Sequence, residues 1–131
     1  MKIKLVIADN NENSLAELVS IIRGDRQIQL LGKASDGFAV VDLIKKTAPD
    51  VVLLDLILPN MDGLEVMQEI RDYRGLSKKP AFIILSAIGN STIVNQAVSM
   101  GAVYYIMKPY ERKLIIKRIH QVMHGPAGNF T

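Results

Sequence analysis

The stretch PDVVLLDLILPNMDGLEVM, residues 49–67, decides the fold. Its apolar run at 51–54 (VVLL) begins with two β-branched residues and has no polar interruption, which is typical of a strand covered on both faces. Asp55 follows this run directly, Pro59 and the turn residues up to Gly63 break the chain, and apolar residues then resume at helical spacing. The stretch therefore predicts a buried strand, a loop headed by a carboxylate, and a helix.

The same alternation extends along the rest of the chain. Four further β-rich runs predict strands at residues 3–8, 27–34, 81–85 and 103–107. Helical spacing predicts helices around residues 15–22 with Gly24 as a stop, at 38–46 with Asp36 or Gly37 near the start, at 64–70, at 93–100 before Gly101, and at 111–123. Five strands alternating with five helices indicate an α/β fold, a doubly wound parallel sheet with right-handed crossovers and helices on both faces.

Length and composition set the class of protein. The 131 residues suit one domain, expected at 1–124, and the Gly- and Pro-containing end at 125–131 is expected to be a linker start or a disordered tail. The net charge of +3 is spread along the sequence, so no direct nucleic-acid binding by this domain is expected. No Cys is present, no apolar run reaches membrane-spanning length, and the N-terminal apolar run is too short for a signal peptide. These features predict a cytoplasmic protein without membrane attachment.

Polar side chains occur at four predicted strand ends. Asp9 and Asn10 follow the first strand, Asp55 the third, Ser86 the fourth and Lys108 the fifth. In open parallel sheets the active site lies beyond the carboxyl ends of the strands, where the strand order reverses. Any one of these residues alone is more often a turn residue, a helix cap or a surface charge. Their joint position predicts a single site.

The chemistry of these groups points to phosphoryl transfer. Carboxylate and amide oxygens are hard ligands that suit Mg²⁺, which keeps several waters in proteins. A carboxylate such as Asp55 can act as a nucleophile and accept a phosphoryl group as an acyl phosphate. Lys108 and Ser86 are then expected to stabilise the phosphoryl oxygens. Catalysis in such a site consists mainly of positioning and charge neutralisation.

The segments LVIADNNEN, PDVVLLDLILPNMDGLEVM, IILSAIG and GAVYYIMKPY resemble those of response-regulator receiver domains, over about residues 2–123. The string D-L-x-L-P-x-M-D-G-L around Asp55 and an aromatic residue three positions before a Lys-Pro pair are its most specific elements. The resemblance implies the flavodoxin-like strand order 2-1-3-4-5. It also implies that a histidine kinase or phosphotransferase supplies the phosphoryl group, with Mg²⁺ or Mn²⁺ as the cofactor, and that the domain is not a turnover enzyme.

The resemblance assigns the metal-binding positions. Asp55 matches the phosphorylated aspartate, which also binds the metal, and Asp9 matches the first acid of the metal-binding pair. Ile57 matches the position whose backbone carbonyl binds the metal. Asn10 stands where the family most often has a second, directly coordinating carboxylate. Because an amide oxygen carries no formal charge, weaker metal affinity than in an Asp-Asp site is expected.

The remaining matches concern the switch. Ser86 matches the hydroxyl residue that turns toward the phosphoryl group, and Lys108 matches the lysine that contacts it. Pro109 matches a proline preceded by a cis bond, and Tyr105 matches the aromatic residue that moves between outward and inward rotamers. Phosphorylation is then expected to repack a surface for dimerisation or effector binding. Candidates for this surface are Ile93, Val94, Val98, Tyr104, Lys113 and Lys117.

Within the family, the strings ADNN, SAIGN and GAVYYIMKPYE resemble those of receivers in sporulation transcription regulators. This resemblance implies control of a DNA-binding effector domain, which these 131 residues do not contain, and a possible phosphorylation-dependent homodimer. A stand-alone phosphorelay intermediate is the alternative.

Three other interpretations use the same topology. A haloacid-dehalogenase-type phosphatase needs a second acid two residues after its nucleophile, where this chain has Ile57. A flavin-binding module favours a phosphate-cradling loop after the first strand, whereas ADNNENS carries an acid. A pseudo-receiver binds partners without being phosphorylated, and the presence of Asp55, Ser86 and Lys108 argues against it.

Overall fold

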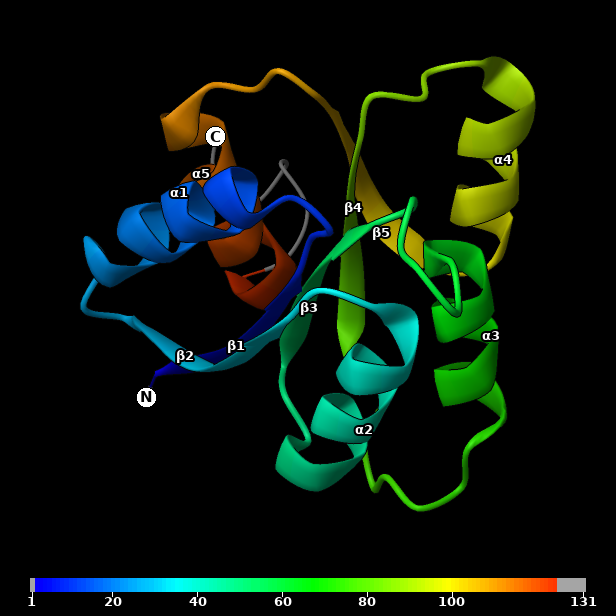
Figure 1. Ribbon diagram of the computed structural model, residues 1–131. Coiled ribbons are helices and arrows are strands. Elements are labelled where there is room, and N and C mark those ends of the chain that lie inside the picture. The colour runs from blue at the N-terminus through cyan, green and yellow to red at the C-terminus, as the bar shows by residue number, and fades with distance from the viewer. Residues whose placement is uncertain (1, 125–131) are drawn as a thin grey trace.

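The computed structural model describes residues 2–124, along which strands and helices alternate (Figure 1). The expected tail at 125–131 lies outside the described residues. The five strands are β1 (Ile3–Ala8), β2 (Ile28–Ala34), β3 (Val51–Asp55), β4 (Ala81–Ser86) and β5 (Ala102–Met107). The five helices are α1 (Glu12–Arg23), α2 (Gly37–Thr47), α3 (Gly63–Asp72), α4 (Ser91–Ser99) and α5 (Arg112–His124).

The strands form one parallel sheet in the order β2-β1-β3-β4-β5. Both the α/β class and the 2-1-3-4-5 order expected from the resemblance are confirmed. The chain leaves β1 for β2 on one side and then crosses to β3 on the other, so the strand order reverses between β1 and β3. The loops after β1 and β3 diverge there, which makes the carboxyl ends of these two strands the expected place for a site.

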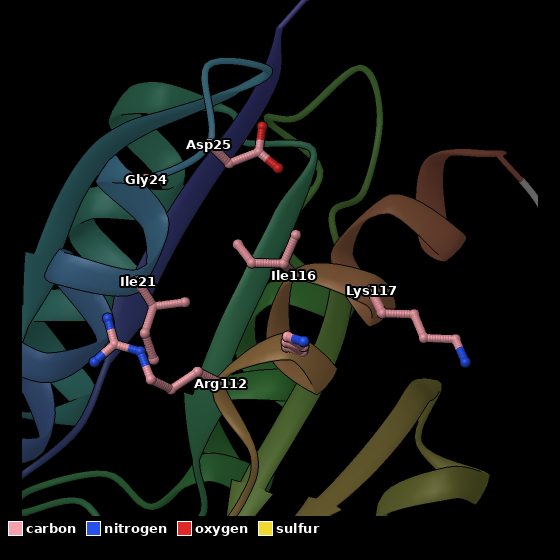
Figure 2. Close-up of a pocket in the computed structure, with 7 residues that line it drawn as sticks. Ile21, Gly24, Asp25, Arg112, Ile116 and Lys117 are labelled. Atoms are coloured by element: carbon pink, nitrogen blue, oxygen red, sulfur yellow. The ribbon is translucent and has the colours of Figure 1, made fainter.

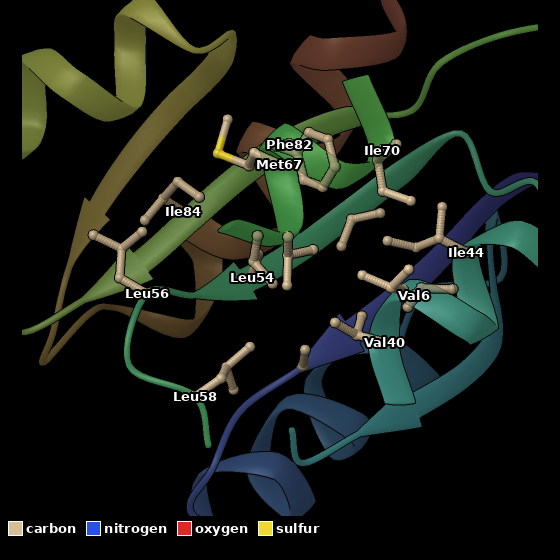
Figure 3. Packing of buried hydrophobic residues seen from close by; sticks show 14 of the residues in the cluster. Val6, Val40, Ile44, Leu54, Leu56, Leu58, Met67, Ile70, Phe82 and Ile84 are labelled. Atoms are coloured by element: carbon tan, nitrogen blue, oxygen red, sulfur yellow. The ribbon is translucent and has the colours of Figure 1, made fainter. Parts of the chain in front are cut away.

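Two apolar cores cover the sheet. Helices α1 and α5 pack on one face, and α2, α3 and α4 pack on the other (Figure 1). Figure 3 shows part of the second core, in which Val40 of α2 and Met67 of α3 pack around Leu54 of β3. All five residues of β3 are buried: the four apolar residues at 51–54, as predicted, and Asp55 as well. Burial of each large aliphatic side chain contributes about 1.5–3 kcal/mol, so β3 is a firm base for the loop that follows it.

Polar caps begin the helices close to this edge of the sheet. The Asn11 side chain accepts a hydrogen bond from the Ser14 N–H at 2.9 Å and caps α1, and Asp36 caps α2 by accepting one from Ala39. Asp62 and Glu65 form a reciprocal capping box at the start of α3. Each cap satisfies backbone donors that have no partner within the helix. The caps therefore fix where the loops of the carboxyl edge end.

Several predicted boundaries are off by one residue. Asp55 and Ser86 are the last residues of β3 and β4 rather than the first residues after them. They keep backbone pairing with neighbouring strands, which holds them more firmly than a loop would. β5 begins at Ala102, preceded by Gly101 with φ +106°, a conformation that favours glycine. In the part of the chain that is described, no helix combines the length and the apolar character needed to cross a membrane.

Candidate functional site

Three charged side chains meet at the carboxyl ends of β1, β3 and β5. The Lys108 ammonium donates to Asp9 Oδ2 at 2.8 Å and to Asp55 Oδ2 at 2.9 Å. The three residues lie 99 and 53 positions apart along the chain, so only the sheet brings them together. Of the residues predicted for the site, these are the ones whose charged groups touch directly.

The charged side chains of this cluster are largely buried, which strengthens the interactions between them. The side chain of Asp9 is fully buried, that of Asp55 is 7% exposed, and that of Lys108 is 22% exposed. Burial alone would lower the pKa of Lys108, but its hydrogen bonds to Asp9 and Asp55 and their charges outweigh burial and raise that pKa above 10.5. Two carboxylates face one ammonium, so the cluster has one negative charge in excess when all three groups are ionised. Such a cluster is suited to a further cation.

Backbone contacts fix the orientation of both carboxylates. Asp9 Oδ1 accepts a hydrogen bond from the Asn11 N–H at 2.9 Å, and Asp55 Oδ1 accepts one from the Ile57 N–H at 3.1 Å. Each carboxylate therefore has one oxygen on a backbone amide and the other on the ammonium. This matched arrangement follows from the turn that the chain makes after each strand.

Gly63, at the start of α3, allows the loop after β3 to return to its own beginning. Its N–H donates to Leu56 O at 2.8 Å. A Cβ at this position would stand 2.7 Å from Asp55 O and 2.8 Å from Leu56 Cα. Because both are backbone atoms, they have little freedom to move away. Glycine is therefore required here to keep Asp55 in place.

Ser86 and Tyr105 are joined through the backbone of Ile88. Ser86 is fully buried, and its Oγ accepts a hydrogen bond from the Ile88 N–H at 3.0 Å. The Tyr105 hydroxyl donates to the carbonyl of Ile88. Asp55 pairs with Leu85 in the sheet, so Ser86 lies one residue further along the neighbouring strand. A change at Ser86 can thus reach Tyr105 through the backbone of a single residue, a role for Ile88 that no sequence motif indicated.

The other predicted residues flank the cluster. Asn10 is exposed in the bend after Asp9, and Ile57 is 52% exposed although its N–H donates to Asp55. The Lys108–Pro109 peptide bond is cis, and the Lys108 N–H donates to Ser86 O at 2.9 Å. The strand ends that carry Lys108 and Ser86 are therefore held side by side.

The donor set fits a magnesium-type ion. Within residues 2–124 there is no group of three or more His, Cys, Asp or Glu side chains arranged to hold a metal. A cation here would rest on the carboxylates of Asp9 and Asp55, neutral oxygens such as the Asn10 amide and the Ile57 carbonyl, and water. Mg²⁺ is commonly held by one or two carboxylates and keeps several waters, whereas Zn²⁺ takes more protein ligands.

An open cavity adjoins the cluster on the side of α1 and the β5–α5 loop. Its volume is ≈ 360 Å³, and it is lined by Ser14, Glu17, Ala87, Lys108, Pro109 and Tyr110. Burial, followed by the negative charge of Glu17, raises the pKa of Tyr110 above 10.0. The phenol therefore stays neutral and able to donate at neutral pH. The cavity gives a partner side chain a route toward Lys108.

Comparisons with known proteins agree on one family. A family model described as the response regulator receiver domain matches residues 5–120. The signal receiver domain of the putative response regulator NarL from Mycobacterium tuberculosis is 31% identical, with 95% of this chain and 98% of that chain covered and a TM-score of 0.87. A DNA-binding response regulator of the LuxR family from Staphylococcus aureus is 27% identical, with 92% and 98% covered and a TM-score of 0.83. A CheX-CheY-BeF3-Mg²⁺ complex from Borrelia burgdorferi gives 26% identity, 92% and 89% coverage and a TM-score of 0.83.

Proposed function

This chain belongs to the response regulator receiver domain family, whose members are phosphoacceptor signalling modules rather than turnover enzymes, and we propose that Asp55 is its phosphoryl acceptor. The observation that carries the proposal is the Lys108 ammonium held between the carboxylates of Asp9 and Asp55. The family assignment also disfavours the phosphatase and flavin-binding interpretations of the same topology.

The transfer itself requires little of the protein beyond position and charge. An oxygen of Asp55 attacks the phosphorus of a donor phosphohistidine, the phosphorus–nitrogen bond breaks, and the imidazole leaves with its electron pair. The new oxygen–phosphorus bond makes an acyl phosphate. Lys108 already contacts the acceptor carboxylate at 2.9 Å, so its ammonium needs only a small shift to reach a phosphoryl oxygen.

A divalent cation bound by Asp9, Asp55, Asn10 and the Ile57 carbonyl would supply positive charge against the phosphoryl oxygens. Receiver domains bind Mg²⁺ for phosphorylation, and one similar structure is a complex that contains Mg²⁺ and BeF3. The excess negative charge of the cluster in this chain favours such an ion. The uncharged Asn10 weakens the site relative to one with three carboxylates.

The acyl phosphate then biases a two-state element. The acyl phosphate carries about 1.5–2 negative charges in place of the single charge of the Asp55 carboxylate, and its oxygens extend beyond the strand end toward Ser86. When the Ser86 hydroxyl turns to donate to a phosphoryl oxygen, it gives up the Ile88 N–H. The carbonyl of Ile88 holds the Tyr105 hydroxyl, so the same movement frees Tyr105 to change rotamer. The surface formed by α4, β5 and α5 repacks as a result.

The proposed phosphoryl donor, effector and subfamily rest on short sequence strings and on similar proteins. A histidine kinase or phosphotransferase is the expected donor, and the partner side chain would approach through the cavity beside Lys108. The similarity to a DNA-binding response regulator supports a DNA-binding effector as the output. We propose from ADNN, SAIGN and GAVYYIMKPYE that the chain is of the sporulation-regulator type, and further propose a cytoplasmic location and a phosphorylation-dependent homodimer.

Labelling with acetyl phosphate and Mg²⁺ tests the acceptor. Intact-mass measurement should show the gain of one phosphoryl group in the parent chain and none in Asp55→Asn. Asp42→Asn is the matched control, because Asp42 is an exposed α2 residue that pairs with Lys46 on the surface. Full labelling of Asp55→Asn would show that another residue accepts the phosphoryl group. Absence of labelling in the parent, under conditions that label a known receiver, would favour the pseudo-receiver.

A further inference from the structure

A second cavity lies away from the phosphorylation site, between α1 and α5. Its volume is ≈ 400 Å³, within the range of about 300–1,000 Å³ common for ligand pockets. It is lined by Ile21, Gly24, Asp25, Arg112, Lys113, Ile116 and Lys117, and is called the α1–α5 groove below. Figure 2 shows Ile21 and Ile116 between the two helices, with Asp25 toward one end and Arg112 toward the other.

The groove has an apolar floor. Ile116 is half-buried and packs against the core on the α1 and α5 face of the sheet. Ile21 is only 6% exposed, so its side chain forms the base of the groove rather than a projection. Surface that is mostly aliphatic and accessible from outside favours contact with an apolar side chain of a partner.

The unpaired charge around this floor is positive. Arg112, Lys113 and Lys117 are all exposed, and none of them lies within ion-pair distance of a carboxylate among residues 2–124. Asp25 is the one acid among the lining residues, and its carboxylate is already engaged. It accepts hydrogen bonds from the Gln27 N–H at 2.8 Å and is paired with His120 Nε2 at 2.8 Å.

We propose that the α1–α5 groove binds an acidic amphipathic segment of a partner protein, with its apolar side chains on Ile21 and Ile116 and its carboxylates on Arg112, Lys113 and Lys117. An apolar floor bordered by cations matches a helix that carries apolar residues on one face and Glu or Asp beside them. By sequence resemblance Lys113 and Lys117 were candidates for the switching surface, and in the structure both line this groove.

Other occupants fit the groove less well. A symmetric contact with a second copy would bring the same three cations together and is opposed by their repulsion. A nucleic acid would use the cations but leave the isoleucine floor against its charged backbone, with no gain from apolar burial. The groove shares no lining residue with the cavity beside Lys108, so a partner can occupy it without blocking access to Lys108.

A fluorescein-labelled helical peptide with leucines four residues apart, flanked by glutamates, is a suitable probe. Fluorescence anisotropy should show saturable binding to the full chain. The double variant Lys113→Glu and Lys117→Glu should weaken binding about tenfold, because two attractions become repulsions. Lys78→Glu is the control, since Lys78 is exposed in the segment between α3 and β4 and does not line the groove.

Separate measurements test the contribution of the apolar floor and the place where the peptide binds. Ile116→Ala should weaken peptide binding while the variant still shows the thermal unfolding transition of a folded chain. Replacing the peptide's glutamates by glutamines should weaken its binding further. Amide chemical-shift changes should centre on Gly24 and Ile116. Absence of saturable binding, equal binding by the charge-reversed double variant, or shifts centred on Val98 and Val103 would overturn the proposal. So would tighter binding of a DNA duplex that the same double variant abolishes.

Discussion

Replacement of Lys108 by methionine isolates the energy of the charged cluster. Methionine is of similar length and unbranched, so the change removes the ammonium and little of the packing. Lys108 makes hydrogen bonds to two carboxylates whose side chains are 0% and 7% exposed. Removing one partner of a buried ion pair costs about 3–5 kcal/mol. Because the Lys108 side chain is itself 22% exposed, we take the lower end, about 3 kcal/mol, which lowers the melting temperature by about 10 °C.

The assay is urea unfolding in the presence of EDTA, so that no divalent cation replaces the ammonium. Lys113→Met is the matched control, because this exposed lysine has no ion pair within residues 2–124, and it should change the free energy of unfolding by less than about 0.5 kcal/mol. The triple variant Asp9→Asn, Asp55→Asn and Lys108→Met removes all three charges and should recover most of the loss. Equal stability of Lys108→Met and the parent would refute the buried cluster.

The pH dependence of this difference has a definite sign. The pKa of Lys108 is raised above 10.5 in the folded chain by the two carboxylates. A raised pKa means that the stabilisation is fully present below the unfolded value of 10.5 and is lost as the pH rises through the folded value. The difference between parent and Lys108→Met should therefore hold from neutral pH to about pH 10 and shrink above that.

Three further predictions concern the metal, a surface ion pair and the loop after β3. Asn10→Asp should raise the affinity for Mg²⁺ in a fluorescence or calorimetric titration; unchanged affinity would mean that Asn10 is not a ligand. Burial opposes ionisation of Asp25, but the hydrogen bond from His120, the Gln27 N–H and the charge of His120 together lower its pKa below 3.8. The stability that this shift provides is present above pH 3.8 and is lost as the pH falls through the pKa of the folded state. The difference in unfolding free energy between the parent and His120→Gln, measured with urea, should therefore decrease between about pH 5 and 3. A difference that increases over this range would contradict the lowered pKa of Asp25. Gly63→Ala should lose about 2–3 kcal/mol, because the new Cβ meets backbone atoms, and should label more slowly with acetyl phosphate; normal labelling and stability would show that the loop relaxes freely.

Much of the fold was readable because each segment carried its own pattern. The run at 51–54 is apolar throughout, and β3 is buried along its whole length. Asp36 was one of two residues expected at the start of the second helix, and it caps α2. The misplaced boundaries at Asp55 and Ser86 share one cause. Backbone pairing with a neighbouring strand extends each strand by one residue, and that pairing depends on contacts far away in the sequence.

The sequence indicated which residues gather at the candidate site but not which of their atoms are in contact. Sequence indicated that Asp9, Asp55 and Lys108 stand at strand ends, and resemblance supplied their roles. It gave no sign that one ammonium would span both carboxylates, or that Ile88 would join Ser86 to Tyr105. Nor did any motif point to the α1–α5 groove, whose lining residues come from two helices far apart in the sequence.

The features that sequence predicts and those that it does not predict differ in the range over which they act. Apolar periodicity, caps and turn residues act over a few neighbours, so the sequence alone determined the order and type of the strands and helices. Contacts between Lys108 and Asp9 join residues 99 positions apart, and the groove joins α1 to α5. Such arrangements depend on the stacking order of the sheet and on which helix faces meet, and only the tertiary structure decided them.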